Sequence, residues 1–478
     1  MESLTYSLSS IAGNFIWVFL IPIYTRIFSP EEYGVIDLIA TVISFFTLFL
    51  YMGLDSATGR YYVDSENDHD RQLTASTTLF YLTGFAFVVV TVAMFFPRPL
   101  SQLIFRNPVY AQILIVAIVA IPFSLMSSYC QILFRFRFES ARFAITAITS
   151  LLFQTGLSIY LVVFLRVGVI GIYLAGLINV VMFSCINLWL TRSSFALVFS
   201  MSRLKELLWF GLPLIPLSLA HYITNYSSRY FLINFLGLRE VGLYGIGYKL
   251  GSLISLFGLG FQYAWGPFVY SNYKDRDAKQ MFANIYDYVS TMLCFGVLIL
   301  SFFAKEILMV FTTQAYVEAY RVVPFIALGI VAYIIGGYFT IGIGIAKKNI
   351  HRAWGAMIAG LINLGLNYVL IPYFGIIGAA IATVISFLVL GVILMYISQR
   401  YYRVEYRFKA NFMMYIIAAL LIFVVYSFFP SGLRFDSISL KVVLLMGFLI
   451  VPFILRLVGP KEIAYIGKLL RSRISSTS

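Results

Sequence analysis

The segment RVGVIGIYLAG (166–176) occurs a second time, in altered form, as YFGIIGAAIAT (373–383). Two glycines and one alanine keep their spacing in both copies: Gly168, Gly171 and Ala175, and, 207 residues later, Gly375, Gly378 and Ala382. Both copies lie in stretches that are too apolar for a water-exposed surface. Small residues also recur wherever membrane helices pack closely, so this pattern alone could arise by chance.

A second matched pattern favours a duplication instead. Glu32 and Gly34 in SPEEYG recur as Glu240 and Gly242 in LREVGLYG, at an offset of 208 residues. Agreement at both ends of the half-chain indicates two similar bundles of membrane helices. Duplicated membrane bundles are typical of transporters, in which two lobes rock around a site near the middle of the bilayer.

Composition places the chain in a membrane. Hydrophobic residues make up 61% and charged residues 11%, with a mean hydropathy of +0.91, whereas soluble domains carry about 25% charged residues. A spanning helix needs roughly 20 mostly apolar residues. The sequence contains fourteen such stretches: 4–27, 35–59, 73–96, 110–134, 143–165, 167–190, 207–232, 242–264, 285–303, 322–345, 354–371, 375–398, 410–429 and 438–458.

These stretches predict an all-α integral membrane protein with about 14 transmembrane helices. Helices one to six form a predicted N-lobe (1–200) and helices seven to twelve a C-lobe (201–400). Helices thirteen and fourteen, with a basic tail, make up 401–478. The first stretch lacks the basic start and cleavage site of a signal peptide, so we expect it to be retained. The three cysteines fall inside predicted spans and suggest no disulfide framework.

The net charge of +14 is explained by the excess of Lys and Arg on one side of the membrane. With both termini placed in the cytoplasm, 23 of the 34 Lys and Arg residues lie in cytoplasmic loops or ends. Short cytoplasmic loops of membrane proteins carry such an excess. We therefore expect a multi-pass protein of the bacterial inner membrane that contacts anionic lipids and binds no nucleic acid.

The loops leave no room for a soluble catalytic domain. No Gly-rich phosphate loop is present, which argues against an ATP motor on this chain. Two Asp-x-Asp triplets, 68–70 and 275–277, resemble a nucleotide-sugar site but lie in short polar loops without a strand pattern. A membrane polysaccharide polymerase is thus the enzyme alternative, and we expect no catalytic residue, no metal site and no cofactor.

Four cations inside or at the ends of spans are the candidate substrate-binding residues: Arg26, Arg60, Arg229 and Lys249. Charges in the bilayer are costly unless they pair or line a wet cavity. Lys249 lies about seven residues into the predicted helix eight, roughly 10 Å deep at 1.5 Å per residue. The three arginines lie near helix ends, where anchoring at the membrane surface is the alternative reading.

Titratable groups in the spans are candidates for coupling transport to an ion. Asp55 lies towards the end of helix two and His221 in the middle of helix seven, and Asp37 and Asp287 begin helices two and nine. Histidine changes charge near neutral pH, although a lone membrane histidine is more often a packing residue. We take Asp55 and His221 as candidate coupling residues for a Na+ or H+ gradient or the membrane potential.

Longer stretches resemble a known family, the bacterial polysaccharide transporters that flip lipid-linked O-antigen and exopolysaccharide units. The resemblance runs in order through YTRIFSPEEYG (24–34), the run from Trp209 to Leu250, YAWGPF (263–268), IAKKN (345–349) and LINLGLNYVLIPYFGIIGAAIAT (361–383). It implies the multidrug/oligosaccharidyl-lipid/polysaccharide exporter fold, with two six-helix lobes around a central cavity and two appended helices.

One departure concerns Arg229. The family commonly has Asp before this Arg, whereas this chain has Ser228. Either Arg229 is freer to meet an anionic substrate, or its partner lies elsewhere. An ion-coupling role carried over from the usual acidic residue is therefore in doubt.

The resemblance also implies the substrate, an oligosaccharide unit on undecaprenyl diphosphate, and the O-antigen, exopolysaccharide or capsule pathway. A diphosphate needs cations in a cavity of low dielectric, which agrees with the four candidates. A polysaccharide polymerase and a chain-length regulator are the expected protein partners. A lipid II flippase is the nearest alternative, followed by a multidrug antiporter, for which acidic cavity residues would be expected.

Overall fold

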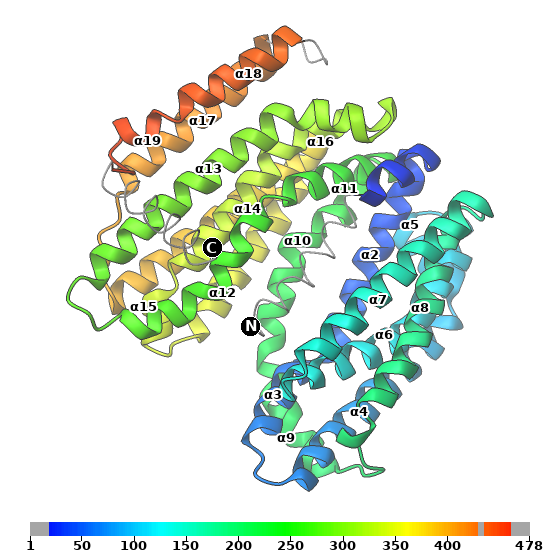
Figure 1. The fold of residues 1–478 in the computed structure, drawn as a ribbon. Coiled ribbons are helices and arrows are strands. Elements are labelled where there is room, and N and C mark those ends of the chain that lie inside the picture. The colour runs from blue at the N-terminus through cyan, green and yellow to red at the C-terminus, as the bar shows by residue number, and fades with distance from the viewer. Residues whose placement is uncertain (1–18, 429–434, 460–478) are drawn as a thin grey trace, which may run out of the picture. The chain divides into compact units, whose positions relative to one another are not determined.

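The computed structural model describes residues 19–428 and 435–459, and within these ranges it contains helices and no strand (Figure 1). By their contacts the helices form two compact units. Unit 1 comprises Met1–Gly245 with Gly360–Ala379, and unit 2 comprises Ile246–Ala359 with Ala380–Ser478. The predicted N-lobe and C-lobe were defined by the sequence repeat, whereas these units are defined by contacts. The units therefore do not test the lobes, which stay a prediction.

Residues 19–27 are helical, and short 3-10 and π segments separate several of the later helices. The elements up to α10 are α2 (Pro30–Tyr51), α3 (Leu54–Asp64), α4 (Asp68–Met94), α5 (Pro97–Phe105), η1 (Pro108–Tyr110), α6 (Ala111–Phe136), α7 (Ser140–Ile159), η2 (Tyr160–Phe164), α8 (Val169–Leu190), η3 (Arg192–Ser194), α9 (Met201–Gly211), η4 (Leu212–Leu214) and α10 (Ile215–Phe235). The remaining elements are α11 (Leu238–Ser252), α12 (Ser255–Asn272), α13 (Ala278–Phe311), η5 (Gln314–Val322), α14 (Val323–Tyr338), α15 (Ile341–Ile345), α16 (Ile350–Tyr401), α17 (Phe408–Phe428), α18 (Phe435–Phe448) and α19 (Val451–Ile454).

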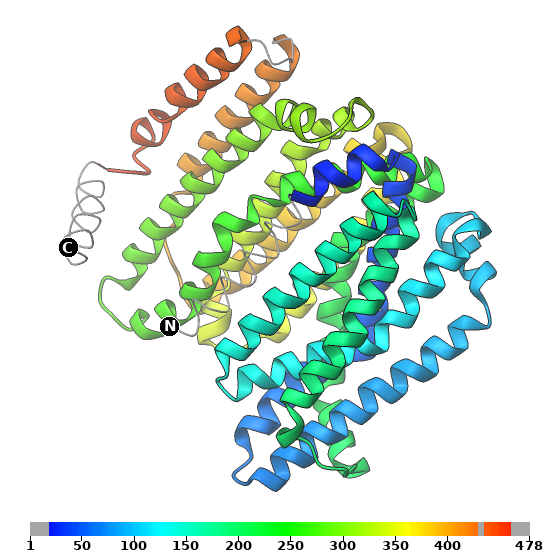
Figure 2. The same cartoon turned by 45° about the vertical axis from the view of Figure 1, so that its right-hand side comes forward.

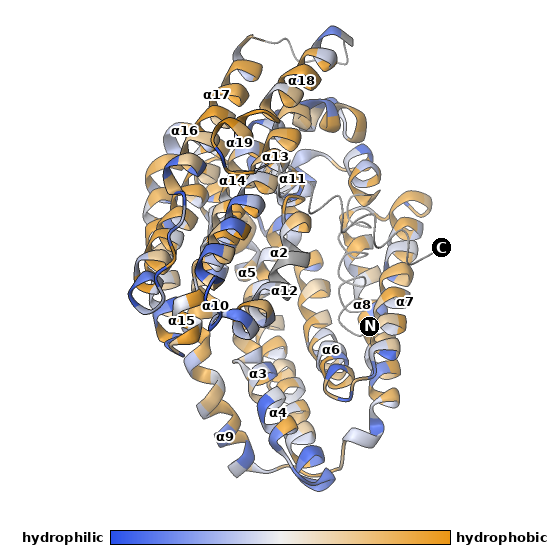
Figure 3. Ribbon diagram, turned by 60° about the vertical axis from the view of Figure 1, so that its left-hand side comes forward, coloured by the Kyte–Doolittle hydropathy of each residue, from blue (hydrophilic) through white to orange (hydrophobic). Residues whose placement is uncertain are grey.

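The all-helical membrane fold predicted from the sequence is confirmed. Eleven helical segments among the described residues are long and apolar enough to cross a membrane. Figure 3 shows hydrophobic residues along the helices and hydrophilic ones gathered at their ends. Many large apolar side chains are exposed, as expected where helices face lipid.

The count of fourteen transmembrane helices stays a prediction, because the described helices begin and end at other residues than the predicted spans. Most of the first predicted span, 4–27, lies outside the described residues. The predicted helix eight appears as two helices, α11 and α12. The predicted helices eleven and twelve appear as α16, which is kinked at Gly375.

The repeated glycines have a structural reason. Gly168 and Gly375 both have positive φ, 78° and 58°, a conformation that side chains with a Cβ rarely adopt. Gly168 caps the start of α8 and Gly375 marks the kink of α16. Each copy of the repeat thus uses glycine to reverse or bend the backbone between two helices.

The repeated motif SPEEYG begins α2 with a capping box. The backbone N–H of Glu32 donates to the Ser29 hydroxyl (3.2 Å), and the backbone N–H of Ser29 donates to the Glu32 carboxylate (2.8 Å). Pro30 occupies the first turn, where its missing N–H costs nothing. Glu32 is therefore a helix-starting residue.

Unit 1 has its core among α3, α4, α6 and α9, where Leu54, Leu79, Tyr129 and Leu207 are buried together. In Figures 1 and 2, α4, α6, α7 and α8 lie side by side in this unit. In unit 2, α13 packs against α14, α17 and α18. The appended helices α17 and α18 therefore attach to the unit through α13.

Candidate functional site

The repeat-related helices α2 and α11 cross at their repeated glycines. A Cβ on Gly34 would collide with the backbone carbonyl of Leu238, and a Cβ on Gly242 would collide with that of Pro30. Pro30 and Leu238 are themselves 208 residues apart, so each copy of the repeat presents a glycine to the same carbonyl of the other. Such a reciprocal contact is the signature of a two-fold relationship. Only glycine permits so close an approach of the two backbones.

An ion pair lies beside this crossing. Arg229 Nε of α10 donates to Asp37 Oδ2 of α2 at 2.9 Å, and the two side chains are only 4% and 9% exposed. Gly245 leaves the space for the carboxylate, since a Cβ there would lie 2.9 Å from the Asp37 carboxyl carbon. The pair joins the first copy of the repeat to the second.

Further contacts hold the guanidinium of Arg229. One of its nitrogens donates to the Asn225 backbone carbonyl. The rings of Tyr226 and Tyr244 lie 5.4 and 5.2 Å from the guanidinium carbon, within cation–π range. A buried arginine that lost its carboxylate partner would be strongly destabilising, so these contacts and Asp37 belong together.

The sequence left two alternatives open for Arg229, and the structure supplies a partner elsewhere, Asp37. Ser228, which stands where the family commonly has Asp, donates to Asn367 at 3.1 Å. Asn367 donates in turn to Asn363, which accepts from Ser227 at 2.9 Å. This polar network attaches α10 to the first part of α16.

Lys249 lies close to a break between two helices. It stands eleven residues after Leu238 at the start of α11, about 16 Å along the helix at 1.5 Å per residue. The helix ends at Ser252, and α12 begins at Ser255. Lys249 is half-buried and lies in the last turn, where the helix dipole stabilises a cation. Helices interrupted in the membrane are typical of binding sites in transporters.

The remaining predicted cations are exposed residues of unit 1, and Arg60 lies within α3 instead of at a helix end as the sequence predicted. Arg26 is exposed at the end of the helical residues 19–27. Arg60 of α3 is exposed, pairs with Asp64 at 3.7 Å and covers the ring of Phe210 at 5.1 Å. Asp55 is also exposed on α3, and the carboxylate that pairs with Arg60 is that of Asp64.

His221 shares one face of α10 with the ion pair. His221, Asn225 and Arg229 follow one another at intervals of four residues, which aligns them along a helix. The Asn225 side-chain amide donates to the His221 backbone carbonyl at 2.8 Å. His221 and Arg229 thus lie on the same face of α10, about 12 Å apart along the helix at 1.5 Å per residue, whereas Arg26, Arg60 and Asp55 lie on other helices.

Unit 2 contains two polar clusters, of whose members Asp287 alone was noted from the sequence, as a titratable group at the start of a span. Lys441 of α18 donates to Glu306 of α13 at 2.5 Å, with both side chains buried. Near the other end of α13, Asp287 accepts from Asn411 of α17 at 2.7 Å and lies 3.6 Å from Arg407. Opposite charges inside apolar spans were the available signal. In the described part of the chain, no three His, Cys, Asp or Glu side chains could together hold a metal ion.

A family model described as "Polysaccharide biosynthesis protein" matches residues 23–321. The "Succinoglycan biosynthesis transport protein" of Rhizobium meliloti (strain 1021) is 25% identical over 252 residues, which are 52% of this chain and 49% of the relative. The match thus spans about half the length of this curated relative.

Solved structures share the fold. "Lipid II flippase MurJ, inward closed conformation" superposes with a TM-score of 0.75 at 16% identity, covering 94% of this chain and 98% of that one. An inward-facing multidrug resistance transporter of the MATE family gives a TM-score of 0.60 at 16% identity, covering 86% of this chain and 96% of that one. At these identities the likeness concerns the fold alone.

Proposed function

The chain belongs to the polysaccharide biosynthesis protein family, as the sequence resemblance indicated, and from this premise we propose that it is a lipid-linked oligosaccharide flippase. It is a multi-pass membrane protein whose fold is that of transporters. In our proposal it moves an undecaprenyl-diphosphate-linked repeat unit across the bacterial inner membrane by alternating access. The protein makes and breaks no covalent bond.

The crossing of α2 and α11 is the observation that carries this proposal. Alternating access requires contacts between the two repeats that form in one state and separate in another. Gly34 and Gly242 supply a close backbone contact, and Arg229 with Asp37 supplies a buried ion pair next to it. In the predicted topology these residues lie near the outer ends of their helices. We therefore assign them to an outer gate between the repeats, closed in this conformation.

Lys249 is our preferred contact for the diphosphate. A cation in a helix interrupted in the membrane is stabilised when a dianionic group or water meets it. Arg26 and Arg60 are exposed, and we assign them to guiding the substrate at the membrane surface. Arg229 meets the substrate in this scheme only after its pair with Asp37 has opened.

Coupling to a Na+ or H+ gradient or to the membrane potential would involve the titratable groups near the gate. His221 lies on the face of α10 that also carries Arg229, so its protonation would place a second positive charge there. Asp55 on α3 is the other candidate. We propose no metal or organic cofactor, and a polymerase and a chain-length regulator as downstream partners.

A lipid II flippase is the second candidate, because the superposition on MurJ covers almost the whole chain. Gene deletion separates the two. Our proposal expects undecaprenyl-linked repeat units to accumulate on the inner face while surface polysaccharide is lost and growth continues. Lysis with accumulation of lipid II would support the alternative, and glycan lengthening by the purified protein would overturn both.

A further inference from the structure

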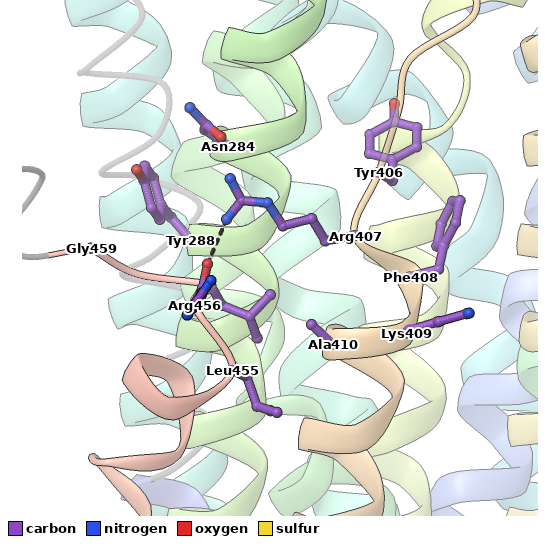
Figure 4. A pocket seen from close by; sticks show the side chains of 11 residues that line it. Asn284, Tyr288, Tyr406, Arg407, Phe408, Lys409, Ala410, Leu455, Arg456 and Gly459 are labelled. Atoms are coloured by element: carbon purple, nitrogen blue, oxygen red, sulfur yellow. Dashed lines mark hydrogen bonds between the residues drawn. The ribbon is translucent and has the colours of Figure 1, made fainter.

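We propose that unit 2 binds the headgroup of an anionic phospholipid in a basic pocket where α17 begins. The pocket has a volume of about 860 Å³. Its walls come from the first turns of α13, from residues 406–410 and from residues 455–459. Figure 4 shows Arg407 extending across the pocket toward the backbone of Arg456.

The charge of the pocket is positive. Three cations line it, Arg407, Lys409 and Arg456, and no Asp or Glu is among its lining residues. Asp287 approaches from behind, 3.6 Å from an Arg407 nitrogen, and neutralises at most one of the three. The positive charge that remains would attract the negatively charged phosphate of a lipid headgroup.

Arg407 is held in place before any ligand arrives. Its guanidinium donates to the Arg456 backbone carbonyl at 2.5 Å and lies beside the buried carboxylate of Asp287. Asp287 is itself held by the side-chain amide of Asn411 at 2.7 Å. A guanidinium fixed in this way loses little entropy when it binds a phosphate.

The pocket is also amphipathic, as a site at the membrane surface should be. Phe408, Leu455 and Leu457 are apolar members of its lining, and Tyr288 and Tyr406 supply phenols. All three wall segments lie at helix ends that the sequence places on the cytoplasmic side. Basic pockets between helices at this level bind anionic lipid headgroups.

An apolar groove next to the pocket would receive an acyl chain. The groove has a volume of about 680 Å³ between α14, α16 and α17, and it shares Phe408 and Lys409 with the pocket. Figure 4 shows Lys409 extending from α17 away from the Arg407 guanidinium. A phospholipid carries both a phosphate and an acyl chain, whereas a free anion would use the pocket alone. None of the residues that we assign to substrate transport lines either cavity.

Binding of purified full-length protein to dimyristoyl phosphatidylglycerol, measured by native mass spectrometry, tests the proposal. Phosphatidylglycerol should bind at least about tenfold more tightly than phosphatidylcholine of the same chain length. Arg456→Gln should weaken phosphatidylglycerol binding about fivefold, as expected for one basic residue near a lipid phosphate. Arg456→Lys should retain most of it. Lys348→Gln, which removes an exposed cation outside both cavities, is the matched control and should change nothing.

The substitution at 456 keeps the backbone carbonyl that accepts from Arg407, and Lys409→Gln provides a second variant should the first fail to fold. Equal binding of the two lipids, or equal loss in Lys348→Gln, would overturn the proposal. Displacement of the lipid by millimolar inorganic phosphate would show a free-anion site instead. Stronger binding of undecaprenyl phosphate than of phosphatidylglycerol would assign the pocket to the substrate lipid and would equally overturn it.

Discussion

The carboxylate of Asp37 lies against Gly245, the residue that the sequence repeat pairs with Asp37 itself. A Cβ at position 245 would lie 2.9 Å from the carboxyl carbon, so a larger residue would displace the carboxylate. One copy of the repeat thus carries the acid and the other leaves room for it. The two-fold relationship between the repeats determines where α2 and α11 cross. The repeats differ at this pair of positions, Asp37 in one and Gly245 in the other, and this difference makes room for the ion pair between Asp37 and Arg229.

Gly242→Leu should prevent the close crossing, because its side chain would have to occupy the position of the Pro30 carbonyl. We expect export of surface polysaccharide to fall at least about tenfold at equal protein level, since the outer gate would no longer close. In a background without native cysteines, Val241→Cys reports the gate directly. Val241 is fully buried in this closed conformation, so a membrane-impermeant maleimide should label Cys at 241 slowly in the otherwise unchanged protein and much faster when Gly242→Leu is also present.

Gly84→Leu is the matched control for that experiment. Gly84 lies on α4, and a Cβ there would meet no atom within 4 Å. Its replacement should leave both export and labelling unchanged. If Gly242→Leu exported normally, the crossing of α2 and α11 would not be a moving contact.

Asp37→Asn and Arg229→Gln should each destabilise the folded protein by about 3 kcal/mol or more, because each leaves a buried charge without its partner. The double variant should lose much less than the sum of the two. Reversible unfolding in mixed micelles measures the coupling. Exchanging the charges, with Arg at 37 and Asp at 229, should not restore stability, because the space at Gly245 accommodates a carboxylate and not a guanidinium.

Lys249→Ala should abolish export while the protein remains inserted and folded, and Lys249→Arg should retain part of the activity because the charge is kept. Lys305→Ala is the matched control, since Lys305 is another half-buried lysine of unit 2 and lies in α13, a helix long and apolar enough to cross the membrane. Surface polysaccharide at matched protein levels is the measurement. Full export by Lys249→Ala would remove this residue from the diphosphate site.

Local patterns in the sequence predicted what depends on neighbouring residues. Apolar runs predicted the helices, and the spacing of Gly168 and Gly375 predicted a repeat that the structure explains by their positive φ. The break between α11 and α12 was missed, because the run from 242 to 264 is apolar without a proline at the break.

Contacts between distant residues could not be predicted in this way. Asp37 and Arg229 were both noted as charges in spans, but they lie 192 residues apart and nothing local pairs them. Glu306 and Lys441 are 135 residues apart, and the same reason applies. Their pairing follows from which helices pack together, and the sequence of one chain does not fix that.

The predicted topology has fourteen spans with both termini in the cytoplasm. Reporter fusions at Arg403 and at Ser478 should read cytoplasmic, and a fusion after Phe429 should read periplasmic. Ser478 and Phe429 lie outside the described residues, so the fusions test the prediction independently of the structure. An external C-terminus would contradict the topology and with it the assignment of the basic pocket to the cytoplasmic side.

The pair between Glu306 and Lys441 should be structural, in contrast to the pair at the gate. It attaches α18 to α13 within unit 2. Glu306→Leu or Lys441→Met alone should cost about 3 to 5 kcal/mol, because one buried charge would remain unpaired. The double variant should be close to the parent in stability, since apolar residues of similar volume can replace a buried pair.

Glu206→Gln, which removes one half of the exposed pair with Arg203, should cost less than about 1 kcal/mol and serves as the control. Normal export by the stable double variant is the expected result. Loss of export despite normal stability would instead place these two charges in the transport cycle.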